Sequence, residues 1–224
     1  MTYKLFYADG SAAQGVRVIL EELGVPYELI ESTIDRSKQR PPEQLKINPN
    51  GWVPVLMYED TGIYECAAIA IFLCDRHSDA NLAPTLHDAT RGLYLQTLVY
   101  FSNSVQTAFQ TNYYPDRFVD LSGDEASAKK RGIRRLRETW KIIDDQIGDN
   151  DWVLGKDFSA VDIYLFMLTT WLNPTRGHPN IEEFPNVKRI AEAAMSRPSI
   201  QLVYAEWLSE NNINQKKPPG VNLK

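Results

Sequence analysis

A proline interrupts what otherwise reads as a buried strand. The stretch 50–56, NGWVPVL, places a turn before an apolar run, and Pro54 lies inside that run. Proline has no N–H to donate to a sheet ladder, so it is tolerated only at an edge, at the first residue of a strand or at a bulge. An ordinary central strand therefore does not explain this stretch, whereas a strand that the proline opens does.

Strand and helix patterns alternate through the first 80 residues. Apolar residues recur at helical spacing from Val16 to Leu23, and Gly24 stands where a helix commonly ends in a left-handed residue. The letters EDTG separate two short apolar runs and predict a hairpin. The predicted strands are 3–7, 27–31, 53–58 and 62–65, and the predicted helices are 16–23 and 66–76, with at most a short helix between 37 and 51.

No strand pattern of comparable strength follows residue 80. Ser159 and Asp162 have the spacing of a capping box, and Pro185 suits the first turn of a further helix. The predicted helices are 87–110, 124–147, one that begins at 159 and one over 184–198. The sequence therefore predicts an α/β domain over 1–80, a linker over 81–88, an all-α domain over 89–214 and a tail over 215–224.

Composition and charge argue against several classes of protein. The 224 residues are 43% hydrophobic with a net charge of −5, and no basic block suggests nucleic acid as a partner. The longest apolar run, 163–172, is too short for a membrane span, and the N-terminus shows no apolar signal segment. Cys66 and Cys74, eight residues apart on a predicted helix, are too distant for a disulfide, which favours a reducing, cytoplasmic setting.

Four stretches resemble cytosolic glutathione transferases. They are NPNGWVPVL, YECAAIAIFL, FSAVDIYLF and FPNVKRIAEAAMSRPSIQ. The resemblance covers about residues 3–208, and the helical half is most similar to the bacterial beta class. It implies a thioredoxin-like first domain followed by an all-helical domain, a homodimer, and glutathione as co-substrate without a metal.

The same resemblance implies a role for the proline. It implies a cis bond between Val53 and Pro54, so that the N–H and C=O of Val53 face a groove. An extended peptide such as glutathione then pairs with these groups like an added strand. A trans proline at the start of an edge strand is the structural alternative.

Glutathione also needs partners for two carboxylates and one ammonium group. Glu65 and the amide of Cys66 precede a predicted helix, where backbone donors suit the γ-glutamyl carboxylate and Glu65 suits the ammonium. Trp52 offers an indole N–H to the glycyl carboxylate, and Lys38 and Arg40 are the cations of the preceding loop. The structural alternatives are a first-turn acid, a buried small residue and solvated loop charges.

The sequence leaves open which group activates the thiol. Counted from the first strand, Ser11 falls where serine-type transferases keep their catalytic serine, and a hydroxyl there would favour the nucleophilic thiolate. Counted from the helix, that position is Ala12 or Ala13, and the cysteine and histidine of the beta class have no counterpart. Gln14 or a backbone amide is the second candidate, and Tyr7 the third. Their structural alternatives are an N-cap, a solvated helix residue and a core tyrosine.

The second substrate is expected between the two domains. Its predicted wall mixes aromatic and polar side chains, which suits a hydrophobic electrophile with a polar end, although aromatic residues at this spacing also serve as core. The candidates are Tyr100, Asn103, Ser104, Thr107, Tyr113 and Tyr114.

Three functions are therefore compatible with the sequence. The first is a detoxifying transferase that adds the glutathione thiolate to an electrophilic carbon. The second is a disulfide or peroxide reductase that uses glutathione, suggested by Gln14. The third is a non-catalytic interaction domain that keeps the fold, suggested by the absent cysteine and histidine.

Overall fold

The N-terminal half is built on a four-stranded sheet. In this computed structural model, which describes residues 2–120 and 123–211, the strand order is β2-β1-β3-β4. Strand β1 pairs with β2 in parallel and with β3 antiparallel, and β3 pairs antiparallel with β4. The strands are β1 (Tyr3–Tyr7), β2 (Tyr27–Glu31), β3 (Val55–Tyr58) and β4 (Thr61–Tyr64). This mixed sheet confirms the predicted thioredoxin-like domain.

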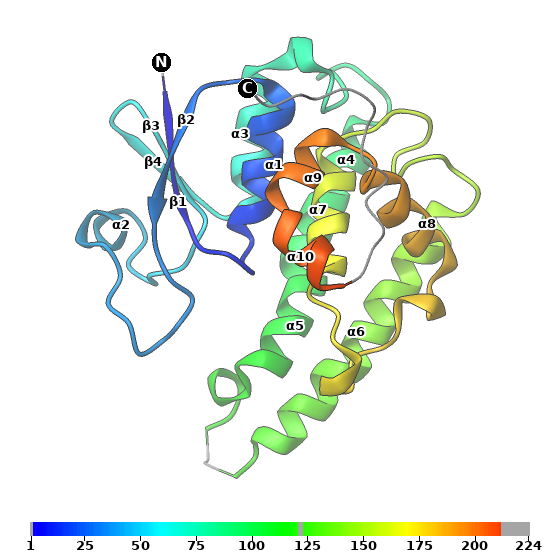
Figure 1. The fold of residues 1–224 in the computed structure, drawn as a ribbon. Coiled ribbons are helices and arrows are strands. Elements are labelled where there is room, and N and C mark those ends of the chain that lie inside the picture. Colours follow the sequence, from blue (N-terminus) through cyan, green and yellow to red (C-terminus); the bar gives the residue numbers. More distant parts are fainter. Residues whose placement is uncertain (1, 121–122, 212–224) are drawn as a thin grey trace.

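Helices α1 (Ala13–Leu23) and α3 (Cys66–Arg76) cover the face of the sheet that is turned toward the helical half (Figure 1). The short α2 (Pro42–Ile47) lies on the other side of the sheet. The predicted end of α1 is confirmed, since Gly24 adopts φ 62° and its N–H reaches the last turn of the helix. Cys66 and Cys74 are both buried on α3 and carry free thiols, as their spacing predicts.

The helical half differs from the prediction in its first helix. The predicted helix 87–110 begins only at α4 (Arg91–Tyr100), and its middle is the π-helical segment η2 (Phe101–Val105) before α5 (Gln106–Tyr113). In a π-helical turn the backbone hydrogen bonds span five residues where those of an α-helix span four, and such turns are frequent at functional sites. The apolar periodicity did not reveal this change, because five residues are too few for a π-helical spacing to be distinguished from an α-helical one.

Three later helices follow the prediction more closely: α6 (Glu125–Ile147), α7 (Ala160–Thr169) and α8 (Pro185–Ala194). Helices α9 (Pro198–Val203) and α10 (Ala205–Glu210) lie beyond the last predicted helix and were not predicted. Short 3-10 turns lie at Ser78–Ala80, Pro115–Phe118, Pro174–Arg176 and Ile181–Glu183. Helices α5 and α6 pack together and project away from the sheet (Figure 1). The predicted tail 215–224 lies outside the described residues.

The predicted capping box holds the start of α7. The Ser159 hydroxyl accepts from the Val161 N–H, and the Asp162 carboxylate accepts from the Ser159 N–H at 2.8 Å. Asp162 also accepts from the Val153 N–H at 2.8 Å, so it anchors a preceding loop as well as the helix. This second bond makes Asp162 a tertiary anchor, which a capping motif alone does not reveal.

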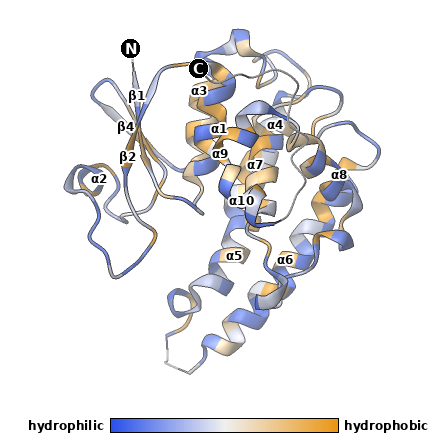
Figure 2. Ribbon diagram, viewed as in Figure 1, coloured by the Kyte–Doolittle hydropathy of each residue, from blue (hydrophilic) through white to orange (hydrophobic). Residues whose placement is uncertain are grey.

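The two halves share one apolar core. Apolar residues gather where α1, α3, α7 and α9 meet (Figure 2), and the buried cluster is continuous across them. A Cβ on Gly15 would lie 2.7 Å from the Met167 sulfur, so glycine lets α1 approach α7 without displacing that side chain. Glu22 on α1 receives a bidentate pair from Arg197, which precedes α9. The two sides of any site between the halves are therefore held rigidly.

Candidate active site

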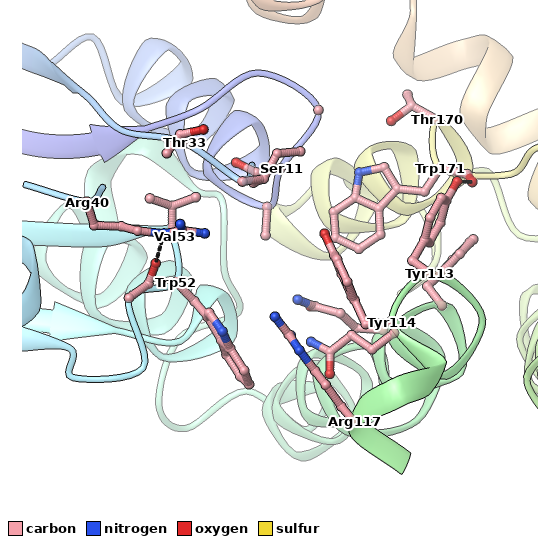
Figure 3. A pocket seen from close by; sticks show the side chains of 17 residues that line it. Ser11, Thr33, Arg40, Trp52, Val53, Tyr113, Tyr114, Arg117, Thr170 and Trp171 are labelled. Atoms are coloured by element: carbon pink, nitrogen blue, oxygen red, sulfur yellow. Dashed lines mark hydrogen bonds between the residues drawn. The ribbon is translucent and has the colours of Figure 1, made fainter. Parts of the chain in front are cut away.

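Two connected cavities lie between the sheet domain and the helical half. The larger measures about 360 Å³ and the smaller about 250 Å³, within or near the range of small-molecule sites. Trp52, Val53, Gln106 and Gln110 line both. We call the lining residues numbered below 70 the sheet wall and those numbered above 100 the helical wall; Figure 3 shows the two facing each other across the larger cavity.

The predicted cis bond between Val53 and Pro54 is present, at the junction of the cavities. Among the described residues, the N–H and C=O of Val53 have no hydrogen-bond partner. The loop before them is held from behind, because the Gln44 and Asn48 side chains donate to the Trp52 carbonyl at 3.1 and 3.2 Å. Val53 thus presents one fixed donor and one fixed acceptor for an extended peptide.

Glu65 lies at the smaller cavity in an unusual backbone conformation. Its φ is 74° directly before α3, where a residue other than glycine is rare. The exposed carboxylate has no ion-pair partner among the described residues, and the first-turn amides of α3 follow it. A strained residue with an unpaired charge beside free helix amides is suited to a ligand that carries both a cation and an anion.

Cys66 lines the smaller cavity beside Glu65 but is itself buried. Burial raises the pKa of its thiol to about 12, and its sulfur lies 3.7 Å from the Ala12 carbonyl oxygen. A thiol with so high a pKa is protonated near neutral pH and is a poor nucleophile. The Cys66 thiol is therefore not suited to act as the nucleophile of the site, and its backbone amide remains the predicted donor.

Ser11 lies at the N-terminal end of α1, in the wall of the larger cavity (Figure 3). Its hydroxyl donates to the Ala8 carbonyl at 2.6 Å and accepts from the Ala13 N–H at 3.1 Å, as a capping residue does. Rotation of the hydroxyl proton toward a ligand would break only the bond to Ala8. The positive end of the helix dipole lies at the same place and favours an anion there.

The other two candidates for thiol activation do not line the two connected cavities. The carboxamide oxygen of Gln14 accepts from the Gly10 N–H at 3.0 Å, and the side chain is buried. The Tyr7 hydroxyl donates to Asp9 at 2.7 Å in a separate hollow. Burial, followed by the Asp9 hydrogen bond, raises the pKa of Tyr7 to about 12. The geometry thus brings only Ser11 of these three to the site.

Of the two predicted loop cations, only Arg40 lines a cavity of the site. Arg40 lines the larger cavity, and its guanidinium donates to the Gly51 carbonyl at 3.3 Å and to the Lys38 carbonyl at 2.6 Å. Lys38 is exposed and lines neither cavity. Its backbone carbonyl accepts a hydrogen bond from Arg40, whereas the sequence suggested a role for its side chain. Arg40 is the better candidate for a carboxylate of the ligand.

The helical wall contains part of the predicted electrophile site. Tyr113 and Tyr114 line the larger cavity, and Asn103 and Thr107 line the smaller one opposite Glu65. The Tyr113 hydroxyl donates to the Trp171 carbonyl at 2.9 Å, which fixes the ring. Two further predicted residues, Tyr100 and Ser104, line neither cavity.

Several lining residues were missed by the sequence analysis. Gln106 lies three residues after Asn103 and Gln110 three residues after Thr107, so helical spacing alone was sufficient to find them. The Tyr164 hydroxyl donates to the Gln106 carboxamide oxygen at 2.6 Å, which turns the amide N–H groups of Gln106 away from α7. The other missed residues are Ser102, Phe109, Arg117, Thr170 and Trp171 on the helical wall, and Gly10, Thr33, Ile34, Asn48 and Gly51 on the sheet wall. Of these, Thr33, Ile34, Thr170 and Trp171 come from segments that carry no local signal.

A buried histidine supports the helical wall from behind. The Asn173 N–H donates to His178 Nδ1 at 3.2 Å, so Nε2 carries the proton and donates to Asn112 Oδ1 at 2.8 Å. The ring packs edge-on against Tyr113 with centroids 5.3 Å apart. His178 is therefore neutral in this arrangement and orders the wall without lining the cavities.

Family models identify both halves of the chain. The model described as the glutathione S-transferase N-terminal domain matches residues 10–76, and the C-terminal domain model matches residues 73–198, more than half of the chain. The chain therefore belongs to the glutathione S-transferase family. The predicted family and class of enzyme are confirmed at this level.

Individual relatives are distant but nearly full-length. Glutathione S-transferase GstA of Escherichia coli O157:H7 is 25% identical over 88% of this chain and 95% of its own. The GST-like protein YncG of Escherichia coli K12 is 28% identical over 94% and 98%. A glutathione transferase homologue from Sulfitobacter, solved with bound glutathione, superposes with a TM-score of 0.83 at 24% identity, covering 92% of this chain and 98% of its own. This structural likeness shows the fold.

Two further observations concern the described part of the chain as a whole. No group of three or more His, Cys, Asp and Glu side chains in residues 2–120 and 123–211 is arranged to hold a metal ion. None of the helices within those ranges is both long enough and apolar enough to cross a membrane.

Proposed function

We propose that this protein activates glutathione as its thiolate and conjugates it to a hydrophobic electrophile. The tripeptide lies along the sheet wall, with its backbone paired to the N–H and C=O of Val53. Its γ-glutamyl end meets Glu65 and the first amides of α3, and its glycyl carboxylate meets Arg40 and the Trp52 indole. The observation that carries this proposal is the backbone of Val53, which has no partner among the described residues and lies between Glu65 and the cationic loop of Arg40.

The thiol of glutathione bound in this way lies toward Ser11 and the start of α1. A free thiol has a pKa of about 8.5, so it must be lowered for reaction near neutral pH. The Ser11 hydroxyl and the positive helix end both stabilise a thiolate. The thiolate then forms a C–S bond to the electrophilic carbon, the leaving group departs with its electron pair, and the thiol proton passes to solvent.

The substitution Ser11→Ala tests the role of the hydroxyl. Turnover at neutral pH is expected to fall about ten- to a hundredfold, the effect of losing one to two pKa units of thiolate stabilisation. Much of the loss should return at high pH, where the thiol ionises unaided. Affinity for S-methylglutathione, which has no thiol proton, should stay near that of the wild type.

Gln14→Ala is the matched control for that experiment, because Gln14 is a buried neighbour whose carboxamide oxygen accepts from the Gly10 N–H. Normal activity in Ser11→Ala together with lost activity in Gln14→Ala would reverse their roles. Measuring conjugation of a chloronitrobenzene beside reduction of hydroxyethyl disulfide separates the transferase from the reductase alternative. A protein that is not retained on glutathione resin would instead be a non-catalytic member of the family.

We also propose that the protein is a cytoplasmic, detoxifying homodimer with the boundary between its two domains in the segment 81–88. The dimer is supported by apolar side chains on α4, where Leu93 and Val99 are 40% and 55% exposed. A monomeric mass in light scattering at micromolar concentration would contradict it.

A further inference from the structure

We propose that the electrophile of this site is an aromatic compound that carries a carboxylate, and that Arg117 binds this carboxylate. The inference rests on the proposed function, because it names the class of the second substrate. It starts from the charges of the larger cavity. Both charged residues that line it, Arg40 and Arg117, are arginines, and neither an aspartate nor a glutamate is among its lining residues.

The two arginines are differently engaged. Arg40 belongs to the sheet wall and already donates to three backbone carbonyls. The guanidinium of Arg117 makes no hydrogen bond or ion pair with any residue in 2–120 and 123–211. Arg40 is thus placed for the glycyl carboxylate of glutathione, while the N–H groups of Arg117 are available for a second anion.

Two aromatic rings hold Arg117 in place. Its guanidinium carbon lies 5.1 Å from the centroid of the Trp52 ring and 4.3 Å from that of Tyr114, and Figure 3 shows Arg117 between these two side chains. A guanidinium stacked on aromatic faces keeps its N–H edge free, and this edge matches the two oxygens of a carboxylate. The arrangement orders the cation before a ligand arrives.

The neighbouring acid does not neutralise this cation. Asp116 precedes Arg117, but its carboxylate accepts from Arg36 at 2.8 Å. That contact also links the loop of the sheet domain to the helical half beside the cavity. The charge of Arg117 therefore faces the cavity, and no described residue pairs with it as an acid.

The rest of the helical wall favours an aromatic ring. Phe109 and Tyr113 stack with centroids 6.4 Å apart, and Trp171 meets Phe109 edge-on at 5.7 Å. These flat apolar surfaces lie in the same cavity as Arg117, which is large enough for one substituted ring beside the thiol. An aryl halide with a carboxylate fits both features.

The reaction with such a compound is a substitution on the ring. The thiolate sulfur bonds to the carbon that carries chlorine, the C–Cl bond breaks, and chloride leaves with its electron pair. The carboxylate on the far side of the ring takes no part in the bond changes. Arg117 is therefore expected to act on binding of the electrophile more than on the chemical step.

The test compares 4-chloro-3,5-dinitrobenzoate with its neutral methyl ester, each corrected for its uncatalysed rate with glutathione. Wild-type protein should prefer the acid through a lower KM. In Arg117→Gln the KM for the acid should rise about ten- to a hundredfold, the usual effect of losing a charge-assisted hydrogen bond. The KM for the ester and the KM for glutathione should stay within about twofold, because neither uses the second anion site.

Arg176→Gln is the matched control, because Arg176 stacks over Tyr113 at 4.7 Å but does not line the cavity. It should leave the preference for the acid unchanged. A wild-type protein with no preference, or a preference that survives Arg117→Gln, would overturn the inference. A KM for glutathione that rises in Arg117→Gln, equally with both electrophiles, would instead assign Arg117 to the glycyl carboxylate.

A binding measurement separates this inference from the proposed function. The glutathione conjugates of the acid and of the ester are titrated into the protein, with tryptophan quenching as the readout. If the acid conjugate binds at least tenfold more tightly and loses this advantage in Arg117→Gln, the carboxylate site stands even without turnover. Equal affinities would overturn it, whether or not the protein conjugates either compound.

Discussion

The two walls of the site recognise ligands by different means. The sheet wall presents mainly backbone: the N–H and C=O of Val53, the first amides of α3 and the start of α1. The helical wall presents side chains, with a ring cluster around Phe109 and the stacked guanidinium of Arg117. A backbone-built wall suits one invariant peptide, whereas a wall of side chains is free to specify a particular second substrate.

The largest predicted effect concerns Asp162, which anchors the start of α7 and lies in neither wall. Asp162 is fully buried and accepts from the Val153 N–H, the Ser159 N–H and the Ser159 hydroxyl at 2.8 to 2.9 Å. Asp162→Ala should destabilise the fold by about 3 kcal/mol, because two buried N–H groups lose their acceptor. The melting temperature should fall by roughly 6–12 °C, while the folded fraction keeps near-normal affinity for glutathione. A large loss of affinity at unchanged stability would show that Asp162 acts on glutathione binding and not on the start of α7.

The pH dependence of stability gives an independent check on the same residue. Burial raises the pKa of Asp162 to about 6, although its hydrogen bonds lower it. The folded protein therefore binds a proton that the unfolded chain, with an ordinary pKa of 3.8, does not hold between these values. Stability from this group is present at low pH and is lost as pH rises through about 6. The stability advantage of wild type over Asp162→Asn should thus be larger at pH 4.5 than at pH 7.5 in urea unfolding.

Glu65 is the side chain on which the sheet wall most depends. If it meets the ammonium of the γ-glutamyl end, Glu65→Ala should raise the KM for glutathione about tenfold or more, since a charged hydrogen bond contributes roughly 1.5–3 kcal/mol. The KM for the electrophile should change little. Glu65→Gln keeps the shape of the side chain without its charge, so its KM for glutathione should lie between those of the wild type and Glu65→Ala. An unchanged KM for glutathione in both variants would return Glu65 to a first-turn acid of α3.

The difference between the walls also explains what the sequence predicted and what it did not. The helix-ending glycine and the capping box are local patterns, so the end of α1 at Gly24 and the start of α7 were predicted from them. The cis bond at Val53 was implied by the family resemblance, because the proline alone also allowed a trans bond at the start of an edge strand. The helical wall combines α5 with segments far away in the chain, and nothing local to Trp171 indicates its place beside Phe109. Lys38 and Arg40 show the same limit, because only the folded loop decides which of two nearby cations turns toward the cavity.

The smallest predicted effect concerns the ion pair between Arg36 and Asp116, which joins the sheet domain to the helical half beside the cavity. Arg36 and Asp116 are both about half exposed, so their contact should contribute less than about 1 kcal/mol to stability. Asp116→Asn removes a negative charge beside Arg117 and also frees the positive charge of Arg36. Both changes favour an anionic electrophile, so the KM for the chlorodinitrobenzoate should fall, by no more than about twofold, while that for the ester stays constant. The difference should vanish near 1 M salt, where the screening length is about 3 Å. A change of equal size for the acid and the ester would mean that the pair shapes the cavity, and that the walls are coupled through structure and not through charge.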